Sequence, residues 1–375
     1  MRQVVITGVG AIGPLGHDVE SICATTEGPA EASPAPSAEA PLWPIGGFDA
    51  TRFVSGRLRQ KIDRFVIYGL CAAGMAIEDS RLFPGGIDRE RLGIFVGNCL
   101  GGWWFTEPEL RMLHTRGVRA MSPYVATAWF PAALQGQISL AHGVKGHSKT
   151  FSTFGVAGLQ AIGYAAQAIA ADRADAVICG AAEDLSSAYI RVITLQDLFR
   201  RDGAPSTFGA ARTRPQAEGA AFLLLEDYEH AVRRGADIHC RLTGFADSFA
   251  PDEDRVVEGI RQNLSAVTEE SEGPRLLILD GLFEGEASAT RRAASDLGLP
   301  VGFVDSKPKF GNMFAVSGVM EAACAARSLR RGRVTAKRFE DVATAAGEYG
   351  GVIIQRLSRT GSIVTLGLGR IDPES

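Results

Sequence analysis

The alternation of apolar runs with polar breaks predicts short buried strands separated by helices. Apolar runs of strand length stand between turn residues, and longer segments repeat their apolar residues at helical spacing. Predicted strands are VVITGVG near the start, residues 91–97 before a Gly-rich turn, and residues 176–179, 217–227, 275–281, 350–357 and 362–371. Predicted helices are residues 58–80, the long small-residue stretch after residue 158, and residues 228–236, 252–267 and 316–332. This order indicates a mixed α/β core with layered helices.

Two segments resemble each other weakly, which indicates an internal duplication. Ser148 is followed ten residues later by Gly158 and an Ala-rich helix, and Ser306 twelve residues later by Gly318 and another. A Lys follows each Ser directly. We therefore expect one compact unit of two similar halves, residues 1–237 and 238–375. The Pro- and Ala-rich residues 27–44 predict a surface loop.

Residues 151–184 have the pattern of a catalytic elbow, in which a strand turns sharply into a helix. The polar residues Ser152 and Thr153 precede a tight turn at residues 154–158, and a long helix and a buried strand follow. Enzymes place nucleophiles at such turns because the helix N-terminus stabilises a thiolate or an oxyanion. This turn, however, contains no Cys, and its apex carries no Ser.

Composition and charge argue against several classes of function. The chain has 375 residues, of which 46% are hydrophobic and 22% charged, as in globular proteins with a large core. The net charge of −4 gives no electrostatic reason to bind nucleic acid or anionic membrane. No apolar run reaches the ~20 residues that cross a bilayer. The N-terminus lacks a signal-peptide pattern, and the six cysteines are scattered without a CxxC pair. We therefore expect a cytoplasmic protein with reduced thiols and no zinc site.

Several further motifs favour structural interpretations. Residues 8–13, GVGAIG, fit a dinucleotide-binding pattern, but Pro follows directly and no second strand ends in an acid, so close packing is favoured. Glu183 ends a buried strand, where a structural role outweighs acid–base chemistry. His142 and His147 are interpreted as loop or interface residues. No His occurs in the final 136 residues, so the second half cannot supply imidazole to the elbow.

Two basic clusters and a tryptophan pair leave alternatives open. Basic residues at 57–64 and 330–338 are typical of solvated helix faces, and the alternative is a docking patch for a small acidic partner. Trp103 and Trp104 follow the Gly-rich turn. They either fill the core or wall a pocket or tunnel that opens toward the elbow.

An ordered series of motifs across nearly the whole chain resembles the β-ketoacyl synthase family of the thiolase superfamily. The series is VVITGVGAIGPLG, KIDRF, LGIFVGNCLGG, the stretch from MSPYVATAWF through the elbow helix, ADAVICGAAED, EGAAFLLLEDYEHAVRRGA, SKPKFGNMFAVSGVMEA and GEYGGVIIQRL. The resemblance implies a five-layered α-β-α-β-α sandwich of two similar halves, usually dimeric, without a cofactor or metal.

The resemblance also locates the positions that carry the family's chemistry. Condensing members have a T-A-C-x-x-G elbow, and matching from Gly146 to Gly158 without a gap places Thr153 on the Thr and Gly155 on the Cys. The first catalytic His is matched by Asp280 in LILDGLF. In SKPKFGN the motif Ser, the Lys (Lys307) and the Gly are kept, and Asn312 stands where the second His would be.

These replacements remove the groups that condensation requires. Gly155 offers no sulfur for an acyl thioester. An ionised Asp280 would repel the enolate formed by decarboxylation, and it cannot act as a neutral N–H donor. Asn312 cannot exchange a proton near pH 7, and Lys307 alone cannot perform the reaction. The resemblance therefore implies a catalytically inactive member.

Members without the Cys are known as chain-length factors, the β subunits of type II polyketide synthases. The resemblance implies a heterodimer with an active ketosynthase, cooperation with an acyl carrier protein, and a role in walling the acyl-chain tunnel. Gln is common at the Cys position in such factors, so Gly155 argues against decarboxylase activity. Matching residues 100–158 places the tunnel gate at Trp103, Thr106, Leu110 and Thr127. The short segment at residues 208–220 resembles the compact factors of highly reducing, polyene-type systems.

Two other functions remain open at this point. One is an active acyltransferase or hydrolase of unusual mechanism that uses Ser152 or another residue. Ser152 is expected to lie on the strand, three residues before the elbow apex, which disfavours it. The other is a homodimeric binding or scaffold protein.

Overall fold

The computed structural model describes residues 2–27, 42–199, 214–268, 273–332, 334–338 and 348–371. The strands are β1 Val4–Ile12, β2 Leu42–Trp43, β3 Leu92–Gly97, β4 Ser148–Phe151, β5 Ala176–Glu183, β6 Gln216–Ala217, β7 Gly219–Asp227, β8 Cys240–Phe249, β9 Arg275–Leu279, β10 Val301–Asp305, β11 Val334–Thr335, β12 Glu348–Tyr349, β13 Gly351–Leu357 and β14 Ser362–Gly369. The helices are α1 Val19–Glu27, α2 Gly56–Arg59, α3 Arg64–Ser80, α4 Leu82–Gly85, α5 Trp103–Arg116, α6 Val125–Ala128, α7 Ala133–His142, α8 Ala157–Ala170, α9 Ala188–Phe199, α10 Tyr228–Arg233, α11 Val256–Thr268, α12 Glu286–Asp296, α13 Lys307–Phe310 and α14 Val316–Arg330. The predicted strands are all present, and the predicted loop at residues 27–44 falls mostly outside the described residues.

One long mixed sheet organises the molecule. Its strands lie in the order β10-β9-β13-β14-β8-β1-β7-β5-β3-β4, and β1 joins β8 through the pairs Val5↔Arg241 and Ile6↔Cys240. In the first half, the strands from the outer edge inward are β4, β3, β5, β7 and β1. Counted along the chain, these are the third, second, fourth, fifth and first strands of that half. The second half has the same arrangement, because its strands from the other edge inward are β10, β9, β13, β14 and β8. This repetition supports our proposal that residues 1–237 and 238–375 form two similar halves.

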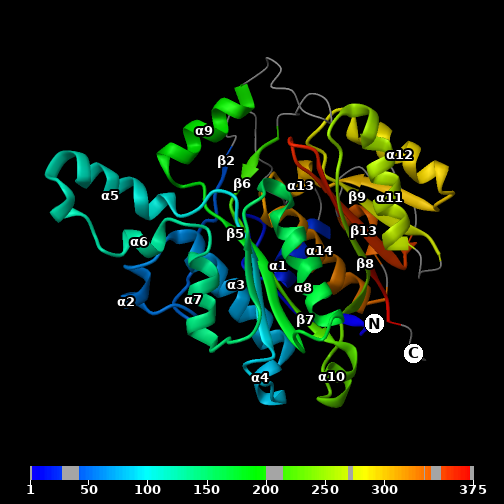
Figure 1. Ribbon diagram of the computed structural model, residues 1–375, viewed down its shortest axis with the longest axis horizontal. Helices are drawn as coiled ribbons and strands as arrows, with labels where there is room; N and C mark the ends of the chain where they lie inside the picture. Colours follow the sequence, from blue (N-terminus) through cyan, green and yellow to red (C-terminus); the bar gives the residue numbers. More distant parts are fainter. Residues whose placement is uncertain are drawn as a thin grey trace.

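The helices form three layers around the two parts of this sheet. α3 packs on β1, β5 and β7 on one outer side, and α11 covers β8 and β14 on the other, with α12 beside it (Figure 1). α8 and α14 lie between the two parts, because each contacts strands of both. The predicted five-layered α-β-α-β-α sandwich is therefore confirmed.

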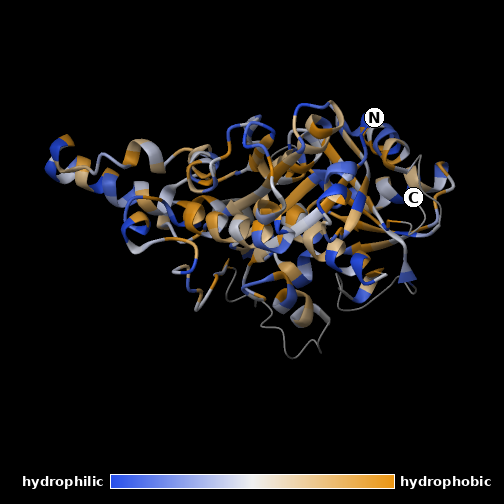
Figure 2. Cartoon of the chain, turned by 90° about the horizontal axis from the view of Figure 1, so that it is seen from below, coloured by the Kyte–Doolittle hydropathy of each residue, from blue (hydrophilic) through white to orange (hydrophobic). Residues whose placement is uncertain are grey.

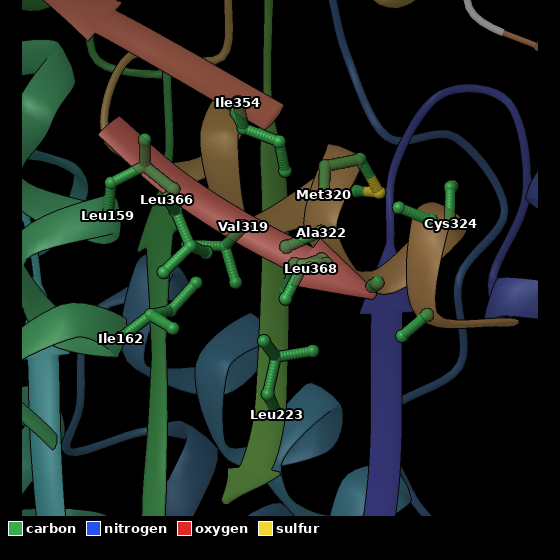
Figure 3. Close-up of a cluster of buried hydrophobic side chains, with 14 of the residues drawn as sticks. Leu159, Ile162, Leu223, Val319, Met320, Ala322, Cys324, Ile354, Leu366 and Leu368 are labelled. Atoms are coloured by element: carbon green, nitrogen blue, oxygen red, sulfur yellow. The ribbon is translucent and has the colours of Figure 1, made fainter. Parts of the chain in front are cut away.

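The central layer is tightly packed. Figure 3 shows apolar side chains of α8 and α14 meeting those of β7, β13 and β14, among them Leu159, Ile162, Leu223, Val319, Met320, Ile354 and Leu366. Two glycines allow this approach. A Cβ on Gly158 would lie 2.0 Å from the carbonyl oxygen of Ala315, and one on Gly318 would lie 2.6 Å from Cγ of Leu159. The repeated glycine of the sequence echo thus marks the contact between the two central helices.

The helix predicted over residues 58–80 is wrong at its start. The chain forms the short helix α2, leaves helical geometry and begins again with α3. The break occurs at Asp63, whose extended backbone (φ −73°, ψ 161°) allows its carboxylate to accept the N–H of Phe65 at 3.1 Å. An N-cap of this kind stabilises a new helix start inside an apolar pattern that looks continuous.

Hydrophobic residues concentrate in the central strands and helices, while polar ones dominate the periphery (Figure 2). Five of the six cysteines are buried and Cys99 is partly exposed, and none forms a disulfide bond within the described residues. Within the described ranges, no helix combines the length and the apolar character needed to span a bilayer.

Candidate functional site

The predicted elbow has the expected strand–turn–helix geometry. β4 leads through residues 152–153 into a single 3-10 turn, Phe154–Val156, and α8 follows directly. Phe154 has a left-handed backbone with φ +56°, so the sharp turn occurs one residue before Gly155. Ser152 lies just past the end of β4, which corrects its expected place on the strand.

Space is available at Gly155. Beyond the adjoining residues of the turn, the one described group within 4 Å of a Cβ placed there is the carbonyl oxygen of Phe314, at 3.9 Å. The turn also contacts α14, β13 and β14 of the other part of the sheet. The absence of a side chain is therefore not imposed by packing, because a larger residue would fit.

Asp280 and Lys307, which were predicted from two different motifs, lie next to each other in the fold. Asp280 follows β9 and is buried, and its carboxylate accepts the N–H of Leu357 at 3.0 Å. The Nζ atom of Lys307 lies 3.6 Å from its other oxygen. Burial lowers the pKa of Lys307 to about 7, an effect that the charge of Arg356 strengthens and that of Asp280 opposes. The side-chain amine of Lys307 therefore lies against the carboxyl group of Asp280 in the interior of the chain.

The contact belongs to a larger buried ionic cluster that sequence reasoning missed. Arg356, fully buried in β13, is ion-paired with Glu321 of α14 and donates to the carbonyl oxygen of Leu279 at 3.2 Å. The hydroxyl of Ser306 also bonds to Glu321. A detectable signal was the pair Gln355-Arg356 inside the otherwise apolar strand GGVIIQRL, because a buried charge requires a partner.

Glu286 completes the cluster beside Asp280. Its carboxylate accepts the N–H groups of Asp280 at 2.6 Å and Gly281 at 2.7 Å, and the side-chain amide of Gln355 at 3.1 Å. Burial raises the pKa of Glu286 to about 7, and the negative charge of Asp280 adds to the effect. The position matched to the first His is therefore enclosed by buried ionisable groups that are hydrogen-bonded within the fold.

Asn312 serves the backbone of its own turn. Its side-chain oxygen accepts the N–H of Phe314 at 3.2 Å, and its main chain bonds to Pro215 and Ala217 at 2.7 and 2.9 Å. Phe314 has a left-handed backbone, φ +51°, and its carbonyl faces Gly155. The turns that carry Gly155 and Asn312 therefore meet, as the motif matching predicts for two positions of one site.

The predicted gate residues group on α5 and α6. Trp103, Thr106 and Leu110 share one face of α5, and Thr127 lies on α6, which packs against α5. The hydroxyl of Thr106 is buried and bonds to the carbonyl of Gly102 at 2.6 Å. Leu110 and Thr127 are exposed in the single chain. The group therefore lies at a surface rather than around an enclosed cavity of this chain.

An aromatic contact that sequence reasoning missed fixes the first gate residue. The Trp103 ring lies against the ring of Tyr189 on α9, with centroids 4.3 Å apart and an interplanar angle of 36°. Glu107 strengthens the same contact, because its carboxylate accepts the hydroxyl of Ser187 at 2.7 Å. α5 is thus joined to the start of α9 by this aromatic contact and by a hydrogen bond one helical turn further along α5.

Two buried carboxylates position the loop and helix that carry the gate. Glu183, at the end of β5, accepts the N–H groups of Cys99 at 2.5 Å and Leu100 at 3.1 Å. Asp63 accepts the N–H of Phe105 at 2.7 Å. Burial raises the pKa of Glu183 to about 8 and that of Asp63 to about 6, and hydrogen bonds from the backbone oppose both shifts. These hydrogen bonds support the structural role expected for Glu183.

Packing and ion pairs involve several of the remaining sequence motifs. GVGAIG lies in the fully buried strand β1 against α3. Arg330 and Arg331 are ion-paired with Asp237 and Glu20, whereas residue 333 of that basic cluster lies outside the described residues. In the described ranges, no group of three or more His, Cys, Asp or Glu side chains is arranged to hold a metal ion.

The comparisons with known proteins agree with this geometry. The family model described as "Beta-ketoacyl synthase, N-terminal domain" matches residues 1–231. The chain belongs to the β-ketoacyl synthase family. Within this family it is 31% identical over 261 residues to the tetracenomycin polyketide synthase ketoacyl synthase beta subunit of Streptomyces glaucescens, covering 66% of this chain and 63% of that one. It is 28% identical over 338 residues to 3-oxoacyl-[acyl-carrier-protein] synthase 2 of Vibrio cholerae, covering 86% and 77%.

Solved β-ketoacyl synthase structures share the fold over the whole chain. A chain from the complex of a type II polyketide synthase acyl-carrier protein with its ketosynthase bound to the hexaketide has a TM-score of 0.86 at 38% identity, covering 99% of this chain and 100% of that one. The ishigamide ketosynthase/chain length factor has a TM-score of 0.81 at 22% identity, with the same coverage. The thiolase-like fold expected from the sequence motifs is confirmed.

Proposed function

We propose that this chain is a chain-length factor, a β-ketoacyl synthase family member without its own condensing activity. It pairs with an active ketosynthase, works with an acyl carrier protein and shapes the tunnel for the growing chain during type II polyketide elongation. The observation that carries the proposal is the elbow, which keeps its strand, turn and helix but has Gly155 where a nucleophile would stand.

The buried ionic cluster supports the loss of activity independently. A condensing site needs neutral N–H donors aimed at a developing oxyanion. Here the carboxylate of Asp280 contacts Lys307, and Asn312 bonds to its own turn. Restoring one group would leave the other positions engaged, so the chain must obtain its chemistry from a partner.

The free edge of the sheet and the apolar side chains near it support a partner subunit. β4 is the last strand of the sheet and pairs only with β3 among the described strands. Leu140 on α7, which contacts β4, is 79% exposed, and Phe154, three residues after β4, is 63% exposed. Trp129 after α6 is 55% exposed. Exposed apolar groups beside an unpaired strand are typical of surfaces that another chain covers. An obligate pair would bury about 2,000 Å² or more.

Co-expression tests the pairing. The chain produced alone should be poorly soluble or self-associated, whereas production with a ketosynthase that has an intact Cys elbow should yield a soluble heterodimer. Native mass spectrometry measures the outcome. A stable, soluble monomer would count against an obligate pair, and condensation of malonyl units by the purified chain alone would refute the proposed inactivity.

A narrower part of the proposal concerns the product. The segment at residues 208–220 is trimmed, and its first part, 208–213, lies outside the described residues. By its resemblance to compact factors, we propose a highly reducing, polyene-type system. Reconstitution with the reducing enzymes of such a system and absorbance spectra of the product test this assignment.

The rival function, an acyltransferase or hydrolase that uses Ser152, has little support. Ser152 follows β4 directly, before the turn. Among the described residues, no hydrogen bond from its hydroxyl to a His or a carboxylate is found. Such a base is what activates a serine nucleophile. Treatment of the chain with a labelled acyl thioester followed by peptide mapping separates the two functions.

A further inference from the structure

The edge strand β4 has backbone groups that are free to pair with another chain. The N–H of Ile94 donates to the carbonyl oxygen of His147 at 3.0 Å, and the parallel pairing with β3 continues to Phe151. The odd-numbered residues of β4 therefore bond to β3, whereas Ser148 and Thr150 direct their N–H and C=O groups outward. Among the described strands, none pairs with this outer edge.

Pairing across a two-fold axis along this edge brings Lys149 next to the same residue of the second chain. Such strands run antiparallel, and residues that oppose each other point to the same face of the sheet. Because side chains alternate along a strand, the axis has to pass through a residue rather than between two. The register that pairs Ser148 of each chain with Thr150 of the other satisfies all the outward groups of β4. That register places the axis at Lys149, so the two copies of this residue oppose each other.

The neighbouring register leads to the same result. With the axis at Thr150, the two copies of Lys149 are diagonal neighbours on the same face, about 7–8 Å apart at their Cα atoms. Both registers therefore bring two ammonium groups together in a pair of identical chains.

The surroundings of Lys149 do not neutralise its charge. Its side chain is exposed, and among the described residues it forms no ion pair. Burial lowers the pKa of His147, and the positive charges of Lys149 and Arg173 lower it further. Residues 110–171, which include α6, α7, β4 and the elbow, contain no Asp or Glu. A second copy of this chain would therefore bring no carboxylate from this segment to the opposing lysines.

We propose that Lys149 is a selectivity residue of the subunit interface, which disfavours a pair of two identical chains and accepts a ketosynthase without a cation at the equivalent position. The inference rests on the proposed function and adds to it a residue that favours the heterodimer. Like charges that meet in an interface oppose the wrong partner. A lysine on a free edge strand is also a common protection against pairing with an identical strand.

Competition between the two kinds of pair tests the proposal. Tagged and untagged copies of this chain are co-expressed with a ketosynthase that has an intact Cys elbow and an uncharged residue at the position equivalent to Lys149. Native mass spectrometry of the purified tagged chain gives the ratio of homodimer to heterodimer. Lys149→Ala in both copies should raise this ratio by about tenfold or more, because the repulsion is removed. Lys149→Arg keeps the charge and should leave the ratio at the wild-type value.

Charge reversal tests whether the residue lies at the axis. A tagged Lys149→Glu copy should pair with an untagged wild-type copy about tenfold more often than two wild-type copies do, since opposite charges then meet. Lys149→Glu in both copies should leave the homodimer as rare as in the wild type. Circular dichroism of each heterodimer should match that of the wild-type heterodimer, because the side chain is exposed.

Lys145→Glu is the matched control. It changes the net charge by the same amount, and its side chain is also exposed. Residue 145 precedes β4, so its two copies would lie toward opposite ends of the paired strands. A mixed pair of Lys145→Glu and wild-type copies should therefore leave the ratio within about twofold of the wild-type value.

The outcomes separate failure of this inference from failure of the proposed function. If the wild-type heterodimer forms but Lys149→Ala and the mixed pair with Lys149→Glu leave the ratio within about twofold, Lys149 does not select the partner. Wild-type chains that form homodimers as readily as heterodimers would also overturn the inference. If the wild-type chain pairs with no ketosynthase, the proposed function itself fails.

Discussion

The ring of Trp103 lies against that of Tyr189, with centroids 4.3 Å apart, so the first predicted gate residue, at the start of α5, is held against α9. A tryptophan packed in this way presents a fixed wall rather than a mobile side chain. Thr106, one turn further along the same face, is small and leaves space. Together they suggest that Trp103 limits the length of the chain in the tunnel.

Trp103→Ala is expected to lengthen the polyketide made by the complex, because it removes the largest group from the gate. Liquid chromatography with mass spectrometry of the released products measures the chain length. Trp104→Ala is the matched control, since its neighbouring indole is exposed in the single chain and lies outside the predicted gate. Unchanged product length for Trp103→Ala would show that the gate lies elsewhere.

Gly155→Cys should fold and expose a thiol without creating a condensing enzyme. Among the described residues beyond its own turn, only the carbonyl oxygen of Phe314 comes within 4 Å of the new Cβ, at 3.9 Å, so no clash is expected. Iodoacetamide should label the new cysteine, as mass spectrometry of the peptide would show. Acyl condensation should stay absent, because Asp280 and Asn312 offer no imidazole. Gly155→Ala serves as the unreactive control, and turnover by Gly155→Cys alone would contradict the proposed inactivity.

Glu183 should make the stability of the complex depend on pH. Its pKa rises from 4.5 to about 8 on burial, so the folded state binds the proton more tightly than the unfolded state. The resulting stabilisation is complete below pH 4.5 and is lost as pH rises toward 8, by up to about 1.4 kcal/mol per pH unit. Glu183→Gln should remove this slope in urea unfolding, relative to wild type.

The exposed Glu253→Gln is the control for that experiment, and it should keep the wild-type pH profile. The partner's groups titrate equally in both complexes, so the difference in slope between wild type and Glu183→Gln reports Glu183 alone. Equal slopes for the two proteins between pH 5 and 8 would mean that Glu183 titrates normally.

Arg356→Met should destabilise the chain strongly. The substitution removes the ion-pair partner of the buried Glu321 and one of the two positive charges near Asp280, which keeps Lys307. Loss of one partner of a buried pair typically costs about 3–5 kcal/mol. Urea unfolding of the complex measures the loss, and Arg292→Met, on the exposed face of α12, should change it little. A loss below about 1 kcal/mol would show that the cluster contributes little to the fold.

Much of the fold could be predicted from local sequence pattern, and the errors of that prediction have local causes. The strands were recognisable because each is a short apolar run, as in RLLILDG and GGVIIQRL. The break at Asp63 was missed because a single capping side chain, bonded to Phe65, interrupts an apolar pattern that otherwise continues. The pair Gln355-Arg356 was a visible anomaly in its strand, but nothing local identified Glu321 as the partner.

The amino-acid sequence by itself determined the order of strands and helices, the elbow pattern and the lack of a nucleophile at Gly155, because these depend on residue type and short-range spacing. Only the tertiary structure decided that Asp280 meets Lys307, that Trp103 rests on Tyr189 and that Phe154 faces outward. The reason is that these contacts join elements distant along the chain. Their meeting depends on the order of the strands in the sheet and on the close approach of α8 and α14.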